Sequence, residues 1–287
     1  MRRVLVVLNV LVCIFSLCGF RPVPQASVAN VAIINRSGQS TARITDGDMI
    51  RLQVKLSQTF SQQEKITFTL GDQGVVVGDC IISEGGDTCQ TESFLSLGWH
   101  WDAGGAAQKI RVVNAYDSGN SFLGQSDALE VLPRPVVMVH GFISTWDSWK
   151  AYLGADGFLA PIGVQGFALG DGQAEGVMNT GSLTNPTGRT NTIAQNAEIE
   201  GQYIAGVKKA TGAEMVDLVV HSMGGMISRY YIDRVMKERD VAQLIMLGSP
   251  MGGSDCSVLP AALGFYLPAS IEIRQSYMQG VFNNQII

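Results

Sequence analysis

The chain has 287 residues, of which 46% are hydrophobic and 16% are charged, so it is long enough for two domains and can bury a large core. Its formal net charge is −5 at pH 7. Proteins that bind nucleic acids usually present a basic face, so this charge balance argues against a nucleic-acid partner.

The first 29 residues have the features of an export signal. Arg2 and Arg3 precede an apolar run at residues 4–20, and a small-x-small pattern follows at residues 27–29. We therefore expect a secreted or cell-surface protein from which the signal peptide, residues 1–29, is removed. The apolar run is long for a cleaved signal and slightly short for a spanning helix, so an N-terminal membrane anchor is the alternative.

The use of cysteine fits export. Cys13 and Cys18 lie within the predicted signal, whereas Cys80 and Cys89 flank a glycine-containing turn. In an oxidising compartment such a pair can cross-link a hairpin, and we predict a disulfide between them. Metal binding is the competing interpretation, but no histidine or further cysteine is near the pair. Cys256 is left without a predicted partner.

Residues 30–132 are predicted to form an all-β domain. Apolar and polar residues alternate at 50–56 and 66–70 with the period of half-buried strands, and turn signals such as residues 46–48 separate the runs. Several short strands at this spacing favour an immunoglobulin-like sandwich. We interpret this domain as a structural spacer. A sugar- or surface-binding role is the alternative, although no aromatic platform stands out.

The pattern changes at Pro133 and Pro135, which form a stiff, extended connector and mark a domain boundary. Over residues 133–287, strand-like and helix-like runs alternate. Continuous apolar strands between helices indicate an α/β domain with a mostly parallel sheet and helices on both faces. The predicted strands are 136–139, 215–220 and 241–247, and the predicted helices are 192–211 and 223–239.

A serine stands where a buried strand runs directly into a helix. Ser222 follows His221 at the end of the strand and precedes the first turn of the helix. A sharp turn at this point lifts the serine above the edge of the sheet and aims the amides of the helix N-terminus at developing negative charge. Such a turn crowds its neighbours, which favours small residues such as Gly224 and Gly225. An ordinary N-cap serine is the alternative.

Residues 220–224 resemble the nucleophile elbow of the α/β-hydrolases, whose signature is Gly-x-Ser-x-Gly. One position departs from that signature, because Val220 stands where the first glycine is expected. Valine is bulkier than the small residues that the family tolerates there, which bears on the tightness of the turn. The resemblance implies that Ser222 is the catalytic nucleophile.

A second stretch, residues 135–142, resembles the strand and loop that supply an oxyanion-hole donor in lipases. It contains the pair His140 and Gly141, in which the family uses the histidine for loop structure. The resemblance implies that the backbone amides of Phe142 and Met223 converge on the carbonyl oxygen of a bound substrate.

A third stretch, residues 244–253, resembles the next strand and loop of lipases and of GPI-inositol-deacylase-like proteins. The resemblance covers about residues 135–255 and is specific for the superfamily. It implies a lipase- or esterase-like hydrolase of carboxylic esters, with an ester or lipid substrate and no metal or organic cofactor. Membrane contact is expected only through a retained signal or a lipid substrate. A thioesterase or amidase of the same superfamily is one alternative, and a non-catalytic binding protein is another.

The acid and the base of such a site are not evident. Of the three histidines, His100 lies in the predicted sandwich, His140 in the His-Gly loop, and His221 beside the nucleophile with its side chain expected to point away. The family places an acidic residue and then a histidine after the serine, and no histidine follows His221. We therefore expect the acid and base to lie beyond residue 287, in a longer enzyme whose hydrolase domain is incomplete here. A complete protein that has lost catalysis is the alternative.

Overall fold

The computed structural model describes residues 29–71 and 74–286. The predicted export signal lies outside these residues except for Ala29. Ala29 is buried and begins the first strand, so the β region starts one residue earlier than predicted. Among the described residues, no helix is both long and apolar enough to cross a membrane.

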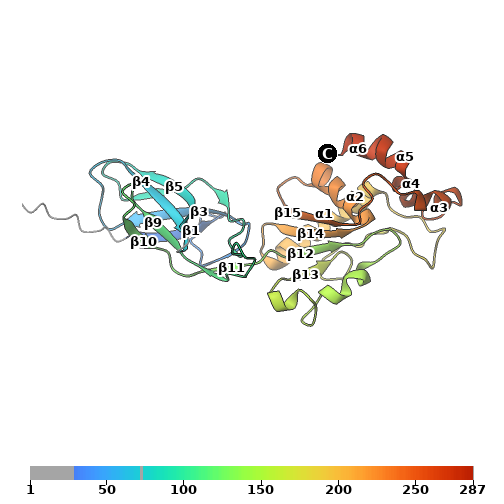
Figure 1. Ribbon diagram of the computed structural model, residues 1–287, viewed down its shortest axis with the longest axis horizontal. Coiled ribbons are helices and arrows are strands. Elements are labelled where there is room, and N and C mark those ends of the chain that lie inside the picture. The colour runs from blue at the N-terminus through green and yellow to red at the C-terminus, as the bar shows by residue number, and fades with distance from the viewer. Residues whose placement is uncertain (1–28, 72–73, 287) are drawn as a thin grey trace, which may run out of the picture.

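The first part of the chain is all β and lies beside the second part along the long axis of the molecule (Figure 1). The alternation seen in the sequence recurs in the burial, because every second residue from Ile50 to Leu56 is buried. The strands are β1 (Ala29–Asn35), β2 (Arg43–Thr45), β3 (Met49–Leu56), β4 (Glu64–Leu70), β5 (Val75–Ile82), β6 (Thr88–Gln90), β7 (Phe94–Leu95), β8 (Ile110–Arg111), β9 (Val113–Tyr116), β10 (Phe122–Gln125) and β11 (Leu129–Leu132).

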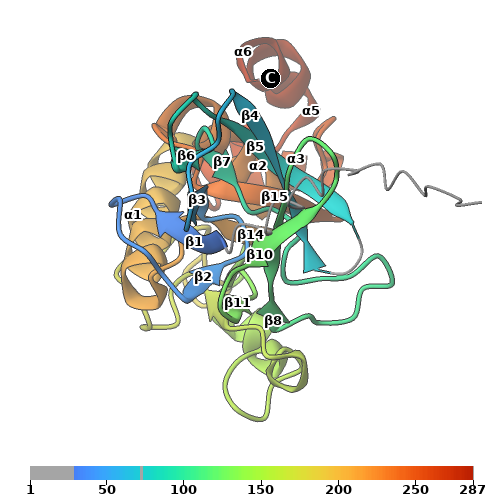
Figure 2. The same cartoon turned by 90° about the vertical axis from the view of Figure 1, so that its left-hand side faces the viewer.

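These strands form three sheets that share one apolar core (Figure 2). One sheet has the order β1-β3-β6 with β7 also paired to β3, another has the order β10-β9-β4-β5, and a small third sheet has the order β2-β11-β8. The third sheet contains a parallel pair, β2 with β11. An immunoglobulin-like topology for this region stays a prediction.

The predicted disulfide between Cys80 and Cys89 is present, with a Cα–Cα distance of 5.8 Å. Cys80 lies in β5 and Cys89 in β6, so the bond joins the two larger sheets. Cys256 is exposed and is not bonded to any other described cysteine.

The second part of the chain contains a sheet of four parallel strands in the order β13-β12-β14-β15. The parallel pairing agrees with the continuous apolar runs in the sequence. Strand β13, at one edge, was not predicted. The elements are β12 (Val136–Val139), η2 (Trp146–Tyr152), η3 (Ala160–Ile162), β13 (Gly166–Ala168), α1 (Ile193–Thr211), β14 (Val216–His221), α2 (Met223–Tyr230), η4 (Tyr231–Val235), β15 (Val241–Leu247), η5 (Asp255–Ser257), α3 (Val258–Ala262), α4 (Ala269–Glu272), α5 (Gln275–Tyr277), η6 (Met278–Phe282) and α6 (Asn283–Gln285).

Helices cover the two faces of this sheet unequally. The larger core lies between the sheet and helices α1 and α2, whereas a smaller core packs η2 against β12 and β13 on the other face. Ile245 and Leu247 of β15 remain 46% and 44% exposed. Helices therefore stand on both faces, but among the described residues those on the second face are short 3₁₀ helices.

Helix α1 agrees with the predicted helix at 192–211 to within one residue. Thr192 caps it in a capping box with Gln195, and Gly212 ends it in a left-handed conformation. The predicted helix at 223–239 is shorter than expected, because α2 passes into the π-helix η4 and the chain becomes extended at Met236. Residues 236–239, which were predicted to be helical, instead lie in the connection between η4 and β15.

A buried carboxyl group joins α1 to α2. Glu200 is completely buried, and one of its oxygens accepts a hydrogen bond of 2.6 Å from the Ser228 hydroxyl. Burial raises the pKa of Glu200 to about 8, so this side chain is protonated at neutral pH.

The two parts of the chain are joined by a buried ionic group at the connector. Arg134 bonds Asp46 through Nη1 and Asp217 through Nε, the latter at 2.8 Å. Asp46 is fully buried and also accepts backbone hydrogen bonds from Gly98 and His100. The connector therefore does more than mark the boundary between the two parts, since Arg134 bonds one carboxylate in each of them.

Candidate active site

Ser222 lies in a strained turn between β14 and α2. Its backbone angles are φ 53° and ψ −123°, a region that residues with a side chain rarely adopt. The turn is held from both sides. The Ser222 amide donates to the Leu247 carbonyl at 3.0 Å, and the Gly225 amide donates to the Ser222 carbonyl at 3.1 Å. Strain that surrounding contacts maintain in this way is typical of functional sites.

The glycines that follow Ser222 are required by close packing. A Cβ atom on Gly224 would lie 2.7 Å from the Val139 carbonyl oxygen, and one on Gly225 would lie 2.7 Å from Ser249 Cβ. The first turn of α2 therefore packs closely against the end of β12 on one side and against the loop after β15 on the other. Val220, which replaces the first glycine of the signature, is fully buried in the core between the sheet and α1 and α2.

The His-Gly loop lies directly against the serine. A Cβ atom on Gly141 would lie 2.7 Å from Ser222 Cβ and 3.2 Å from Ser222 Oγ, so only glycine fits there. His140 is buried, and its Nδ1 lies 3.1 Å from the Gly141 carbonyl oxygen. Burial lowers the pKa of His140, which keeps the ring neutral, and a carbonyl partner requires Nδ1 to carry the proton.

Two backbone amides near the serine are free to donate. Within the described part of the chain, neither the Phe142 amide nor the Met223 amide makes a hydrogen bond. The Phe142 ring packs edge-to-face on Tyr266, with ring centroids 5.5 Å apart. Free amides beside a strained serine have the chemistry that an oxyanion hole needs.

None of the histidines is placed as a base for Ser222. His221 is exposed on β14, and His100 lies in the β region, where its Nδ1 contacts the Val131 carbonyl oxygen at 2.6 Å. His140 is engaged with Gly141. Across residues 29–71 and 74–286, no histidine nitrogen hydrogen-bonds Ser222 Oγ. The acid and base therefore stay unassigned.

Thr180 belongs to the surroundings of this site, and sequence reasoning missed it. Its hydroxyl donates to the Gly141 carbonyl oxygen at 2.9 Å, and its own carbonyl accepts from the Ile143 amide at 3.1 Å. Thr180 is 1% exposed. It lies 39 residues from Gly141 in a polar loop without a recognisable motif, so no signal in the sequence could have placed it there.

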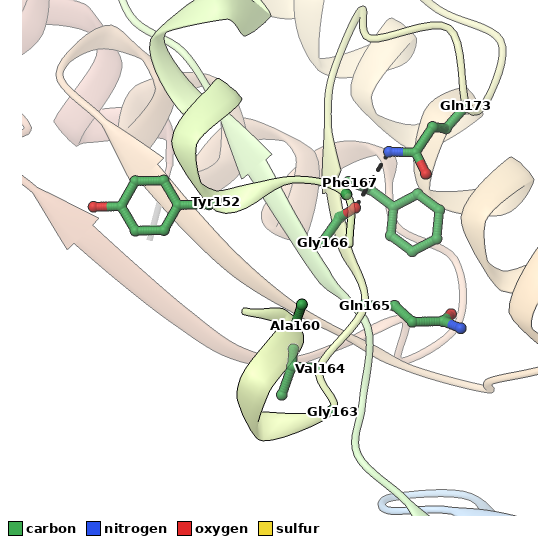
Figure 3. A pocket seen from close by; sticks show the side chains of 9 residues that line it. Tyr152, Ala160, Gly163, Val164, Gln165, Gly166, Phe167 and Gln173 are labelled. Atoms are coloured by element: carbon green, nitrogen blue, oxygen red, sulfur yellow. Dashed lines mark hydrogen bonds between the residues drawn. The ribbon is translucent and has the colours of Figure 1, made fainter. Parts of the chain in front are cut away.

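A separate hollow lies at the opposite end of the sheet (Figure 3). It has a volume of about 400 Å³ and is lined by Tyr152, residues 163–167 and Gln173, whose amide donates to the Gly166 carbonyl. Residues 163–166 of this lining lead into the amino end of β13, whereas Ser222 follows the carboxyl end of β14, and both strands run parallel to β12. This hollow is therefore distinct from the serine site. The described residues contain no group of three or more side chains placed to hold a metal ion.

The family model for palmitoyl protein thioesterases matches residues 135–284, which is more than half of the 287 residues. The chain belongs to the palmitoyl protein thioesterase family. This membership places it among hydrolases of the α/β-hydrolase type, and the matched region contains Ser222 and the whole parallel sheet.

Solved structures of other hydrolases are similar to this palmitoyl protein thioesterase family member at low identity. The mature lipase BlEst2 of Bacillus licheniformis is 17% identical with a TM-score of 0.40, and the match covers 53% of this chain and 59% of the lipase. Epoxide hydrolase A of Mycobacterium thermoresistibile is 18% identical with a TM-score of 0.28, covering 54% of this chain and 41% of that enzyme. The chain thus spans less than two thirds of either protein.

Proposed function

We propose that this protein is an exported serine hydrolase that cleaves acyl esters or thioesters with Ser222 as its nucleophile. The observation that carries the proposal is the strained conformation of Ser222 at the junction of β14 and α2, with Gly141 in contact with its side chain. Membership of the palmitoyl protein thioesterase family supports the same conclusion.

In the proposed reaction, Ser222 Oγ adds to the acyl carbonyl carbon and its proton passes to a base. The carbonyl oxygen becomes an oxyanion, which the amides of Phe142 and Met223 stabilise. The intermediate collapses with loss of an alcohol or a thiol, and water then releases the acid from the serine. The base and its acidic partner are not assigned to any of the 287 residues.

The leaving group decides between the two substrate classes. The sequence motifs favour a carboxylic ester of the lipase type, whereas the family's name refers to a thioester, which was the alternative. The same elbow serves both reactions, so the choice depends on the groups that contact the substrate. The GPI-inositol-deacylase-like assignment is a narrower form of the same proposal.

We also propose that the hydrolase domain begins at residue 133 and that residues 30–132 form an accessory sandwich. Export is supported by the Cys80–Cys89 disulfide, because such bonds persist in oxidising compartments. The signal peptide at residues 1–29 remains part of this proposal.

The test is to trap the acyl group on the serine. The protein is incubated with an acyl p-nitrophenyl ester or with the matching acyl thioester, and peptides are mapped by mass spectrometry. Because no histidine of the described residues hydrogen-bonds Ser222 Oγ, we expect slow, stoichiometric acylation of Ser222 and little turnover. Ser222→Ala is the control for the nucleophile, and urea-unfolded protein is the control for unspecific acylation.

Acylation of Ser222 in the folded protein alone supports the proposal, and the donor whose acylation rate exceeds its own uncatalysed hydrolysis rate by the larger factor identifies the substrate class. Acylation spread over many serines, or equal in folded and unfolded protein, would refute it and favour a non-catalytic protein. Rapid turnover that Ser222→Ala abolishes would show that a base exists among the 287 residues, with His140 and His221 the first to test.

A further inference from the structure

The peptide group between Gly141 and Phe142 is anchored on its oxygen side. The Gly141 carbonyl oxygen accepts hydrogen bonds from Thr180 Oγ1 at 2.9 Å and from His140 Nδ1 at 3.1 Å. In a planar trans peptide, the carbonyl oxygen and the following N–H point in opposite directions. Fixing the oxygen therefore also fixes the direction of the Phe142 N–H.

Thr180 holds the next peptide group as well. The Ile143 amide donates to the Thr180 carbonyl at 3.1 Å, so the hydroxyl and the carbonyl of one residue span Phe142 from both sides. Ile143 has φ 53°, a left-handed conformation that is costly for a β-branched residue. Such a conformation persists only where neighbouring contacts impose it. Thr180 supplies two of these contacts, and it is itself almost completely buried.

The loop that Thr180 holds is the one in contact with the nucleophile. Gly141 approaches Ser222 so closely that no side chain fits between them. The Phe142 amide has no hydrogen-bond acceptor among the described residues, although the Gly141 carbonyl oxygen of the same peptide group and the following Ile143 amide are both bonded. A free amide on a peptide group that is fixed in this way is preorganised, and it needs no reorganisation when charge develops in front of it.

We propose that Thr180 is a positioning residue of the oxyanion hole: its hydroxyl and carbonyl fix residues 141–143 so that the Phe142 N–H faces the carbonyl oxygen of an acyl group on Ser222. This inference rests on the proposed function. Among the described residues Thr180 makes no hydrogen bond to Ser222, so in this proposal it acts through the two peptide groups on either side of Phe142.

The experiment measures covalent capture of Ser222 by an alkyl fluorophosphonate, which forms a tetrahedral phosphonate ester with loss of fluoride and of the serine proton. The rate at saturation and the concentration at half-saturation are determined separately. Thr180→Val removes the hydroxyl and keeps the branched shape, and Thr180→Ser keeps the hydroxyl. Thr211→Val is the matched control, because Thr211 Oγ1 also bonds a backbone carbonyl, that of Val207 at 2.8 Å, and Thr211 ends α1 where the chain enters β14, whereas Ser222 follows the other end of β14.

Removing one donor from an oxyanion hole typically costs about 10²–10³-fold in rate, so misdirecting one should cost about 10–100-fold. We expect Thr180→Val to lower the saturating rate by about that factor with an unchanged half-saturation concentration. Thr180→Ser should restore most of the rate, and Thr211→Val should leave it unchanged. Thr180→Ala replaces the valine variant if that protein does not fold.

Equal rates for the Thr180→Val and Thr211→Val variants, with Ser222 of the wild type captured, would overturn the role of Thr180 and leave the proposed function standing. Failure of Thr180→Ser to restore the rate would also overturn it, because the hydroxyl would then not be the active group. Absence of any label on Ser222 in the wild-type protein would overturn both proposals together.

Discussion

Replacing Arg134 by methionine tests whether the buried ionic group holds the two parts of the chain together. The Asp46 side chain is 0% exposed and the Arg134 side chain 7%, whereas Asp217 keeps 18%. Removing one partner of a buried ion pair typically costs about 3–5 kcal/mol, since a charge is left uncompensated. Two backbone amides still donate to Asp46, at 3.0 and 2.8 Å, so we expect the lower end of this range.

The assay is urea unfolding of the wild type and the variants, followed by circular dichroism and tryptophan fluorescence. Arg43→Met is the matched control, because Arg43 also bonds a carboxylate, Glu130 at 2.6 Å, but both side chains are exposed. We expect no measurable change from that control. In Arg134→Met/Asp46→Asn, part of the lost stability should return, since the stranded carboxylate is gone. If Arg134→Met were no more destabilising than Arg43→Met, our interpretation of the connector would be wrong.

Three further predictions concern the site, the β region and the helical core. Gly141→Ala should slow fluorophosphonate capture of Ser222 at least about tenfold, because the added methyl group would displace the loop or the serine; an unchanged rate would contradict the geometry. Cys80→Ser/Cys89→Ser should lower the free energy of unfolding by about 2–3 kcal/mol, because the disulfide joins residues with a sequence separation of 9 and so restricts the unfolded chain. Urea titration with and without reductant measures this loss. The folded-state pKa of Glu200 is raised to about 8, above the pKa of the unfolded chain. The protonated Glu200 side chain therefore contributes fully to stability below the unfolded-state pKa, and this contribution is lost as the pH rises through the folded-state pKa of about 8. Glu200→Gln should therefore flatten the decline of stability between about pH 5 and pH 8, and an identical pH profile would refute the assignment.

Local patterns in the sequence were sufficient to predict the elements that carry the site. The capping box at Thr192 and the glycine at position 212 define α1 by interactions within one turn at each end. The strand–serine–helix junction at Ser222 is equally local, because β14 and α2 are adjacent in the chain.

Contacts between distant segments could not be predicted in this way. Thr180 and Arg134 look like ordinary loop residues in the sequence, and their roles depend on partners 39 and 83 or more residues away. The short strand β13 was missed because three residues, Gly166–Ala168, are too few to show a period. The end of this helix was misplaced because residues 236–239 carry no glycine or proline that would mark the change to extended backbone at Met236.

The closure of the turn around Ser222 has a consequence for biosynthesis. Gly141, the Leu247 carbonyl and Ser249 all border this turn, and they come from segments before and after it in the chain. Contacts of such long sequence separation form late in folding, after the entropy of loop closure has been paid. A nascent chain that has not yet extended past Ser249 lacks the contacts that Leu247 and Ser249 make with this turn. We therefore expect any reactivity that depends on these contacts to appear only after the strand beyond the serine has been made.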